Sequence, residues 1–162
     1  MGSYAGSLAS GTGYAIVPVT IAYYSETDFI SGPVGSDVVA ARAARAYALL
    51  DTGAEGSGVD ATLAVRIGLR KTGETRNLVS SVAPGGRPSP IYSGLVGMEA
   101  TGSWKLKMFE FIARRQNPRD PNSPLLDGYE MLIGNDLLGS CMFVVDGPAG
   151  QFNLSYDGSV AS

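Results

Sequence analysis

Residues 48–54 of the chain read Ala-Leu-Leu-Asp-Thr-Gly-Ala and place one carboxylate, Asp51, directly after an apolar run. An apolar strand would hold this carboxylate at a rigid position, and Gly53 would let the backbone approach it closely because glycine has no side chain. Local propensity over residues 38–50 favours helix instead, since alanine and arginine are frequent there. On its own, Asp-Thr-Gly also fits a β-turn in which aspartate is the turn former.

A second informative stretch is residues 131–138, which read Met-Leu-Ile-Gly-Asn-Asp-Leu-Leu. Apolar residues lead to a glycine, and the residues after it predict a short helix. The two stretches, in this order, resemble the two signatures of the retropepsin-like (retroviral-type) aspartic proteases. In that family the glycine segment crosses behind the catalytic loop and supports it. The resemblance runs from about Tyr14 to Tyr156, which is nearly the whole chain.

The resemblance implies an all-β fold, a retropepsin-like acid protease barrel with one or two short helices and one lobe per chain. It requires a strand at least from Ala46 onward, against the local helix propensity. The protease domain is expected over residues 14–157. Residues 1–13 are small and rich in glycine and serine, which predicts a flexible N-terminal tail.

Patterns elsewhere in the chain agree with this architecture. The 22 glycines and 9 prolines indicate many turns and short strands. Apolar spacing predicts one short helix within residues 59–69, and strict alternation predicts a strand over 104–111. Residues 116–128 are predicted to form a surface loop. A hairpin is expected where residues 142–145 and 151–156 flank a Gly/Pro turn.

The catalytic chemistry that the resemblance implies needs two aspartates, and the chain carries one Asp-Thr-Gly motif. We therefore expect a homodimer in which each subunit supplies Asp51, with Thr52, Gly53 and Gly134 supporting the site. Two close carboxylates share one proton, so one can activate a water while the other donates to the peptide carbonyl. The expected activity is that of an aspartic endopeptidase, most active in mildly acidic solution, and it needs no cofactor or metal.

Substrate contacts follow from the same resemblance. Ala54 and Glu55 are expected to line the floor of the site and to offer backbone groups to an extended peptide. Residues 80–88 lie where the family has its flap, and Pro84, Gly85 and Gly86 would form the tip of that lid. An ordinary surface hairpin is the alternative interpretation of the same residues.

One position departs from the family pattern. Retroviral members place an arginine after the supporting glycine, and it pairs with an acidic residue four positions after the catalytic aspartate. Here the acidic residue is present as Glu55, but the arginine position is occupied by Asn135. The ion pair is therefore missing or replaced, which bears on the rigidity of the loop and the strength of the dimer.

Composition excludes several other functions. The chain has no histidine, so Ser-His and Cys-His nucleophiles are excluded, and Cys141 alone cannot form an internal disulfide. A net charge of −3 with scattered basic residues does not favour a nucleic-acid partner. The apolar runs are too short to span a bilayer, and no signal peptide is recognised, so we expect no membrane association and a cytoplasmic location.

Two other functions remain open at this level. A retropepsin-like dimer could bind an extended peptide as a scaffold without cleaving it. Alternatively, a monomeric β-barrel could use Asp51 only to shape a turn.

Overall fold

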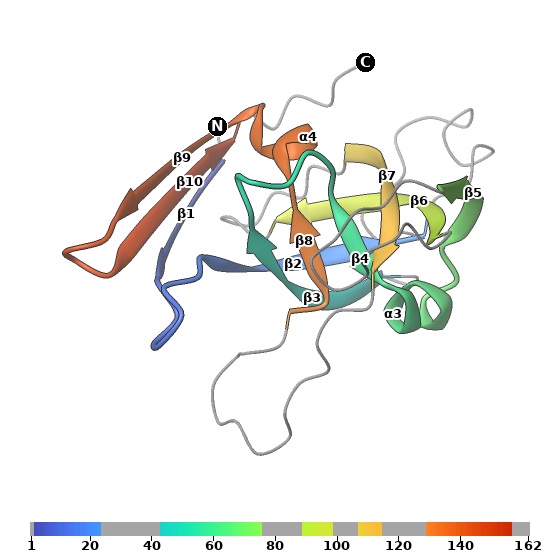
Figure 1. Ribbon diagram of the computed structural model, residues 1–162, viewed down its shortest axis with the longest axis horizontal. Coiled ribbons are helices and arrows are strands. Elements are labelled where there is room, and N and C mark those ends of the chain that lie inside the picture. Colours follow the sequence, from blue (N-terminus) through green and yellow to red (C-terminus); the bar gives the residue numbers. More distant parts are fainter. Residues whose placement is uncertain (1, 24–42, 76–88, 99–106, 115–128, 157–162) are drawn as a thin grey trace.

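The computed structural model describes residues 2–23, 43–75, 89–98, 107–114 and 129–156, and most of them lie in strands (Figure 1). The elements, in chain order, are β1 (Gly2–Ser7), β2 (Ile16–Ala22), β3 (Ala43–Leu50), β4 (Gly58–Asp60), α3 (Ala61–Arg66), β5 (Arg70–Thr75), β6 (Ser89–Met98), β7 (Lys107–Arg114), β8 (Met131–Ile133), α4 (Asn135–Leu138), β9 (Cys141–Asp146) and β10 (Gln151–Tyr156). The predicted all-β class with short helices is confirmed.

Seven strands form a sheet that closes on itself. Their order is β2-β3-β8-β4-β7-β6-β5, and β2 also pairs with β6, from Val19 opposite Met98 to Ala22 opposite Leu95. The pairing of β2 with β6 joins the two sides of the sheet into a barrel, and β5 lies outside the closure on β6. Closure leaves few open sheet edges, and it agrees with the barrel that the sequence predicted.

The strand that leads to Asp51 is β3, so the conflict between propensity and resemblance is resolved in favour of a strand. It lies between β2 and β8, and three of its side chains, Ala46, Ala48 and Leu50, join the main hydrophobic core. Ala46 and Ala48 are buried, and the strand is paired on both sides, with β2 and with β8. Tertiary packing therefore overrides the helix propensity of the alanines.

The helix predicted within residues 59–69 is present as α3, which covers only Ala61–Arg66 of the stretch with helical apolar spacing. Asp60 caps α3 by accepting a 2.9 Å hydrogen bond from the Leu63 N–H, and Leu63 and Ala64 are its buried residues. The chain turns away at Gly68, whose φ of +72° is a conformation that glycine adopts readily. Directly before α3, Gly58–Asp60 form β4, which pairs with β7 and β8 and returns the chain to the barrel.

The prediction of a flexible tail over residues 1–13 is wrong for residues 2–7. These form β1, which pairs with β10 in a second, three-stranded sheet of order β1-β10-β9. Close packing explains the glycine at residue 6, because a Cβ there would lie 2.7 Å from the ring of Phe152. The predicted hairpin of β9 and β10 is confirmed, with Phe152 opposite Val145 and Leu154 opposite Phe143.

Some predictions fall outside the described residues. These are the flap over residues 80–88, the loop over 116–128 and the first part of the strand over 104–111, of which β7 is described from Lys107. Among the described residues, neither helix has the length or the apolar character needed to cross a bilayer.

Candidate active site

Asp51 follows β3 at the point where three strands meet. Its N–H donates to the carbonyl of Ile133 at the end of β8, at 2.9 Å. The preceding residue, Leu50, donates to the carbonyl of Ala15 at 2.9 Å. The backbone is thus held from two neighbouring segments, and Asp51 itself is half-buried. This arrangement fixes the origin of the side chain while leaving the carboxylate within reach of solvent.

The residues after Asp51 form a tight turn. The Ala54 N–H donates to the Asp51 carbonyl at 3.2 Å, and the Gly53 N–H donates to Asp51 Oδ1 at 2.9 Å. A Cβ at residue 53 would lie 3.2 Å from that same oxygen, which is tighter than an ordinary contact. Gly53 therefore lets the backbone donate to the carboxylate, as the sequence predicted, and this bond orients one of its oxygens.

The loop from Asp51 to Ser57 arches over β8. In the sheet, β8 lies between β3 and β4, parallel to the first and antiparallel to the second. The chain that leaves β3 and re-enters at β4 must therefore cross the end of β8 (Figure 1). Residues that are about 80 positions apart in the chain are brought into contact by this crossing, as the bonds between Ser57 and Asp136 show.

Gly134 passes directly under this arch. A Cβ there would lie 2.6 Å from the carbonyl oxygen of Gly56 and 2.8 Å from that of Ala54. Both obstacles are backbone atoms, so no side-chain rotation could relieve the contact. Only glycine lets the two segments approach this closely.

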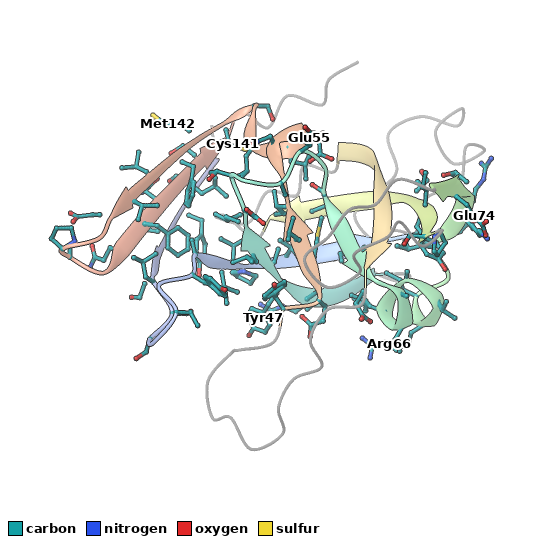
Figure 2. All side chains as sticks on the ribbon, in the orientation of Figure 1. Tyr47, Glu55, Arg66, Glu74, Cys141 and Met142 are labelled. Atoms are coloured by element: carbon teal, nitrogen blue, oxygen red, sulfur yellow. The ribbon has the colours of Figure 1, made fainter. Side chains whose placement is uncertain are left out.

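The start of α4 is joined to the loop by backbone hydrogen bonds. The Asn135 N–H donates to the Ala54 carbonyl at 2.8 Å, and the Asp136 N–H donates to the Glu55 carbonyl at 3.1 Å. N–H groups at a helix start have no partner within the helix, and here the loop carbonyls accept from them. Figure 2 shows Glu55 on the part of the loop that lies beside α4.

Asp136 makes the closest side-chain connection across the arch. Its Oδ1 accepts from the Ser57 hydroxyl at 2.6 Å, and its Oδ2 accepts from the Ser57 N–H at 3.0 Å. Ser57 is fully buried, and its Oγ in turn accepts from the Gly134 N–H at 3.1 Å. The Ser57 end of the arch is thereby linked to Gly134 and to the start of α4.

Asn135 occupies the position at which the family has arginine. Its Nδ2 donates to the carbonyl of Thr52 at 2.8 Å, which is the residue next to Asp51. In place of the expected ion pair, Asn135 makes an amide-to-carbonyl bond to the turn at Asp51. Glu55 is exposed, and its connection to α4 is the backbone bond to Asp136.

This fold is similar to that of a solved structure, a retropepsin-like aspartic protease from Rickettsia conorii. The TM-score is 0.50 at 15% sequence identity, over 95% of this chain and 93% of that chain. The fold is retropepsin-like. At this identity the likeness concerns the fold alone. No protein-family profile matches the sequence, and no curated protein is significantly similar to it.

Within this retropepsin-like fold, most of the predicted site residues lie in one place. Asp51, Thr52, Gly53, Ala54 and Glu55 are consecutive on the arch, and the supporting glycine of the prediction lies beneath them. Ala54 and Glu55 were expected to offer backbone groups to an extended peptide, and their carbonyls accept from the N–H groups of Asn135 and Asp136. The flap residues Pro84, Gly85 and Gly86 lie outside the described residues.

Sequence reasoning missed the importance of Ser57 and Asp136. At the start of α4, Asp136 also accepts from the Leu137 N–H at 2.9 Å. Its other bonds go to Ser57, which no local pattern connects to it. One signal was available in the sequence. Ser57 lies between two glycines, six positions after Asp51, and a hydroxyl at the end of a turn can make the hydrogen bonds that hold the turn in place.

Proposed function

We propose that the chain is an aspartic endopeptidase that acts as a homodimer, with Asp51 from each subunit forming the catalytic pair. The observation that carries this proposal is the support of the Asp51 carboxylate. It is half-buried, it accepts from the Gly53 N–H at 2.9 Å, and its backbone is bonded to β8. A turn that served only to reverse the chain would not need a second segment beneath it.

The mechanism follows from pairing two such carboxylates about a two-fold axis. Because two negative charges a few ångströms apart repel each other, the pair keeps one proton. The ionised Asp51 removes a proton from a water molecule, whose oxygen attacks the peptide carbonyl carbon. The protonated Asp51 donates to the carbonyl oxygen. The C–N bond then breaks as the proton taken from water goes to the leaving nitrogen, and one hydroxyl of the intermediate returns its proton to the other Asp51, which restores the pair.

The surrounding residues would position this chemistry. Thr52 is exposed next to Asp51, and its carbonyl accepts from the Asn135 amide. We propose that its hydroxyl faces the partner subunit across the axis. Groups that are already in position before the reaction do not have to rearrange in the transition state, which lowers the barrier. We propose that an extended peptide lies along Ala54 and Glu55, covered by Pro84, Gly85 and Gly86.

The test compares the wild type with Asp51→Asn on a diverse peptide mixture, from about pH 4 to pH 7, the range in which such pairs titrate. New termini are identified by mass spectrometry. We expect cleavage by the wild type, strongest in mild acid, and a loss of roughly a thousandfold or more in the variant, because the amide cannot act as a base. Asp60→Asn is the matched control, since asparagine is as good a helix cap as aspartate.

An inert wild type that is folded and dimeric would contradict the peptidase proposal. Retention of peptides by that inert dimer, measured with the same mixture, would instead support the alternative of a scaffold that binds extended peptides. Equal cleavage by the wild type and Asp51→Asn would show that the activity does not depend on Asp51 and comes from another site of the protein or from a contaminant.

A further inference from the structure

Glu130 is a half-buried acidic residue that the mechanism above does not use. It lies directly before β8, and its Oε2 accepts from the Tyr47 N–H at 2.9 Å. The Glu130 N–H in turn donates to the Tyr47 carbonyl at 3.0 Å. One residue is thus bonded to both backbone groups of Tyr47, which belongs to β3 and lies 83 positions away in the chain.

These bonds lengthen a very short pairing of strands. β3 and β8 run parallel over only three residue pairs, the last of which is Leu50 opposite Ile133. In a parallel pair, the N–H and the C=O of one residue bond to two different residues of the neighbouring strand. For Tyr47, the side chain of Glu130 supplies the acceptor and its backbone supplies the donor. The carboxylate therefore takes the place of a backbone carbonyl and extends the pairing of β3 with β8.

The backbone of Glu130 also reaches the strand on the other side of β8. Its carbonyl accepts from the N–H of Asp60, the last residue of β4, at 2.7 Å. The pairing of β4 with β8 is shorter still, with two residue pairs. Since β3 leads into the arch and β4 leaves it, Glu130 is bonded to both of the strands that carry the arch.

Glu130 and Asp51 lie at opposite ends of β8. At the arch, the Asp51 N–H donates to the Ile133 carbonyl, and at the other end Tyr47 is bonded to Glu130. Figure 2 labels Tyr47 at this second end and Glu55 on the arch. A strand that is bonded at both ends cannot slide or tilt on its neighbour without breaking one set of bonds. This restraint matters because a displacement of about 1 Å at a reacting group can lower the rate roughly a hundredfold.

We propose that Glu130 is a positioning residue for Asp51, which fixes the register and the angle of β3 on β8 and thereby the place of the Asp51 carboxylate. The inference rests on the peptidase proposal, since it concerns the rate of that reaction. Glu130 does not itself react, because its carboxylate is bonded to the Tyr47 backbone at the end of β8 remote from the arch. Its effect passes through the backbone of β3, in which Tyr47 lies four residues before Asp51.

The chemistry of glutamate suits this role. A hydrogen bond from an amide to an ionised carboxylate is stronger than one between neutral groups. The bond is partly buried, so removal of the carboxylate would leave the Tyr47 N–H with little access to water. Glutamine keeps an acceptor oxygen at the same distance from the backbone, whereas aspartate moves the acceptor back by one bond of about 1.5 Å. These two substitutions therefore separate the hydrogen bond from the charge.

The experiment measures kcat and KM for Glu130→Ala, Glu130→Asp and Glu130→Gln, per folded protein, with a peptide that the wild type cleaves. We expect kcat to fall roughly tenfold in Glu130→Ala and Glu130→Asp, with KM changed by less than about twofold, because the substrate contacts remain. Glu130→Gln should keep kcat within about threefold of the wild type and leave the shape of the pH profile unchanged, since it retains the acceptor. Glu130→Asp carries the same test if Glu130→Ala does not fold.

A destabilised control separates positioning from stability. Val96→Ala removes buried methyl groups from β6, whose neighbours in the sheet are β2, β5 and β7. It should lower Tm without lowering the kcat of the folded protein. Amide hydrogen exchange adds a measurement that does not depend on activity. The N–H groups of Tyr47 and Asp51 should exchange at least about tenfold faster in Glu130→Ala than in Val96→Ala, and should stay protected in Glu130→Gln.

The outcomes distinguish this proposal from the peptidase proposal. A wild type that cleaves no peptide would refute the peptidase, and with it a role of Glu130 in the reaction, even if exchange shows that Glu130 holds β3. An active wild type whose Glu130→Ala and Glu130→Asp variants keep kcat and Asp51 protection would refute the role of Glu130 and keep the peptidase. A loss in Glu130→Gln as large as in Asp51→Asn would also overturn the inference, because the Glu130 carboxylate would then take part in the reaction. An equal fall of kcat in Val96→Ala would reduce the effect to stability.

Discussion

The Ser57 hydroxyl donates to Asp136 Oδ1 at 2.6 Å and thereby joins the end of the Asp51–Ser57 arch to α4. The same hydroxyl oxygen accepts from the Gly134 N–H, so a single buried serine connects three segments. Because Ser57 is fully buried, no water is available to replace either partner at low cost. The pair is therefore expected to contribute to the stability of the arch and to the position of Asp51.

Removal of this connection should destabilise the protein. Ser57→Ala leaves the Gly134 N–H without its acceptor and takes a donor from the Asp136 carboxylate, so we expect a loss of about 1–3 kcal/mol in the free energy of unfolding. Asp136→Asn should cost a similar amount, because an amide cannot accept at both of its terminal atoms. Urea denaturation at one fixed protein concentration measures both values.

The double variant distinguishes a coupled pair from two separate effects. If Ser57 and Asp136 act together, the loss in the double variant should be clearly smaller than the sum of the single losses. Asp60→Asn serves as the control for the amide substitution, since it keeps the cap of α3 and should stay within about 0.5 kcal/mol of the wild type. Additive losses would contradict the coupling that the geometry indicates.

Gly134 gives a second test, which concerns close approach of the backbone. In Gly134→Ala the new Cβ would lie 2.6 Å from the Gly56 carbonyl oxygen, so the arch has to move. Such overpacking usually costs about 1–3 kcal/mol, and we expect the shift to reduce peptide cleavage in addition, because Asp51 belongs to the same arch. Thermal unfolding and kcat/KM are the two measurements.

The matched control for this substitution is Gly73→Ala in β5. No atom lies within 4 Å of a Cβ built at Gly73, so alanine should be tolerated there. A Gly134→Ala variant as stable and active as this control would show that the arch does not depend on contact with Gly134.

The fold could be predicted from the sequence largely because two short stretches lie in the right order. Asp51-Thr52-Gly53 and the segment around Gly134 indicated a crossing of two distant segments, and the structure contains that crossing. The strand β3 illustrates the limit of local reasoning, since its alanines favour helix and only the neighbouring strands make them a strand.

Features that depend on contacts between distant residues could not be predicted. Residues 2–7 are small and polar enough to suggest a tail, and the reason for Gly6 is the ring of Phe152, which lies at the other end of the chain. Likewise, nothing in the local sequence connects Ser57 with Asp136. The composition of a segment indicates which local conformations it can adopt. Which distant segment it contacts depends on the topology of the whole sheet.

Asn135 gives the prediction that bears most directly on catalysis. Its amide donates to the Thr52 carbonyl at 2.8 Å at an exposed position, so the bond contributes little to stability but orients the residue next to Asp51. Asn135→Ala should change the free energy of unfolding by only about 0.5–1.5 kcal/mol. We expect kcat to fall by roughly tenfold with little change in KM, since a turn that is free to move misplaces the carboxylate without removing substrate contacts.

Two controls give this result its meaning. Asn153→Ala makes the same substitution at an exposed position of β10 and should leave kcat unchanged. Asn135→Gln retains an amide on a longer side chain, and partial recovery of kcat would support a hydrogen bond to Thr52 over a simple packing effect. If Asn135→Ala keeps the wild-type kcat, the remaining hydrogen bonds of the turn, among them those of Gly53 and Ile133, are sufficient to hold it. The Asn135 amide would then have no part in positioning the Asp51 carboxylate.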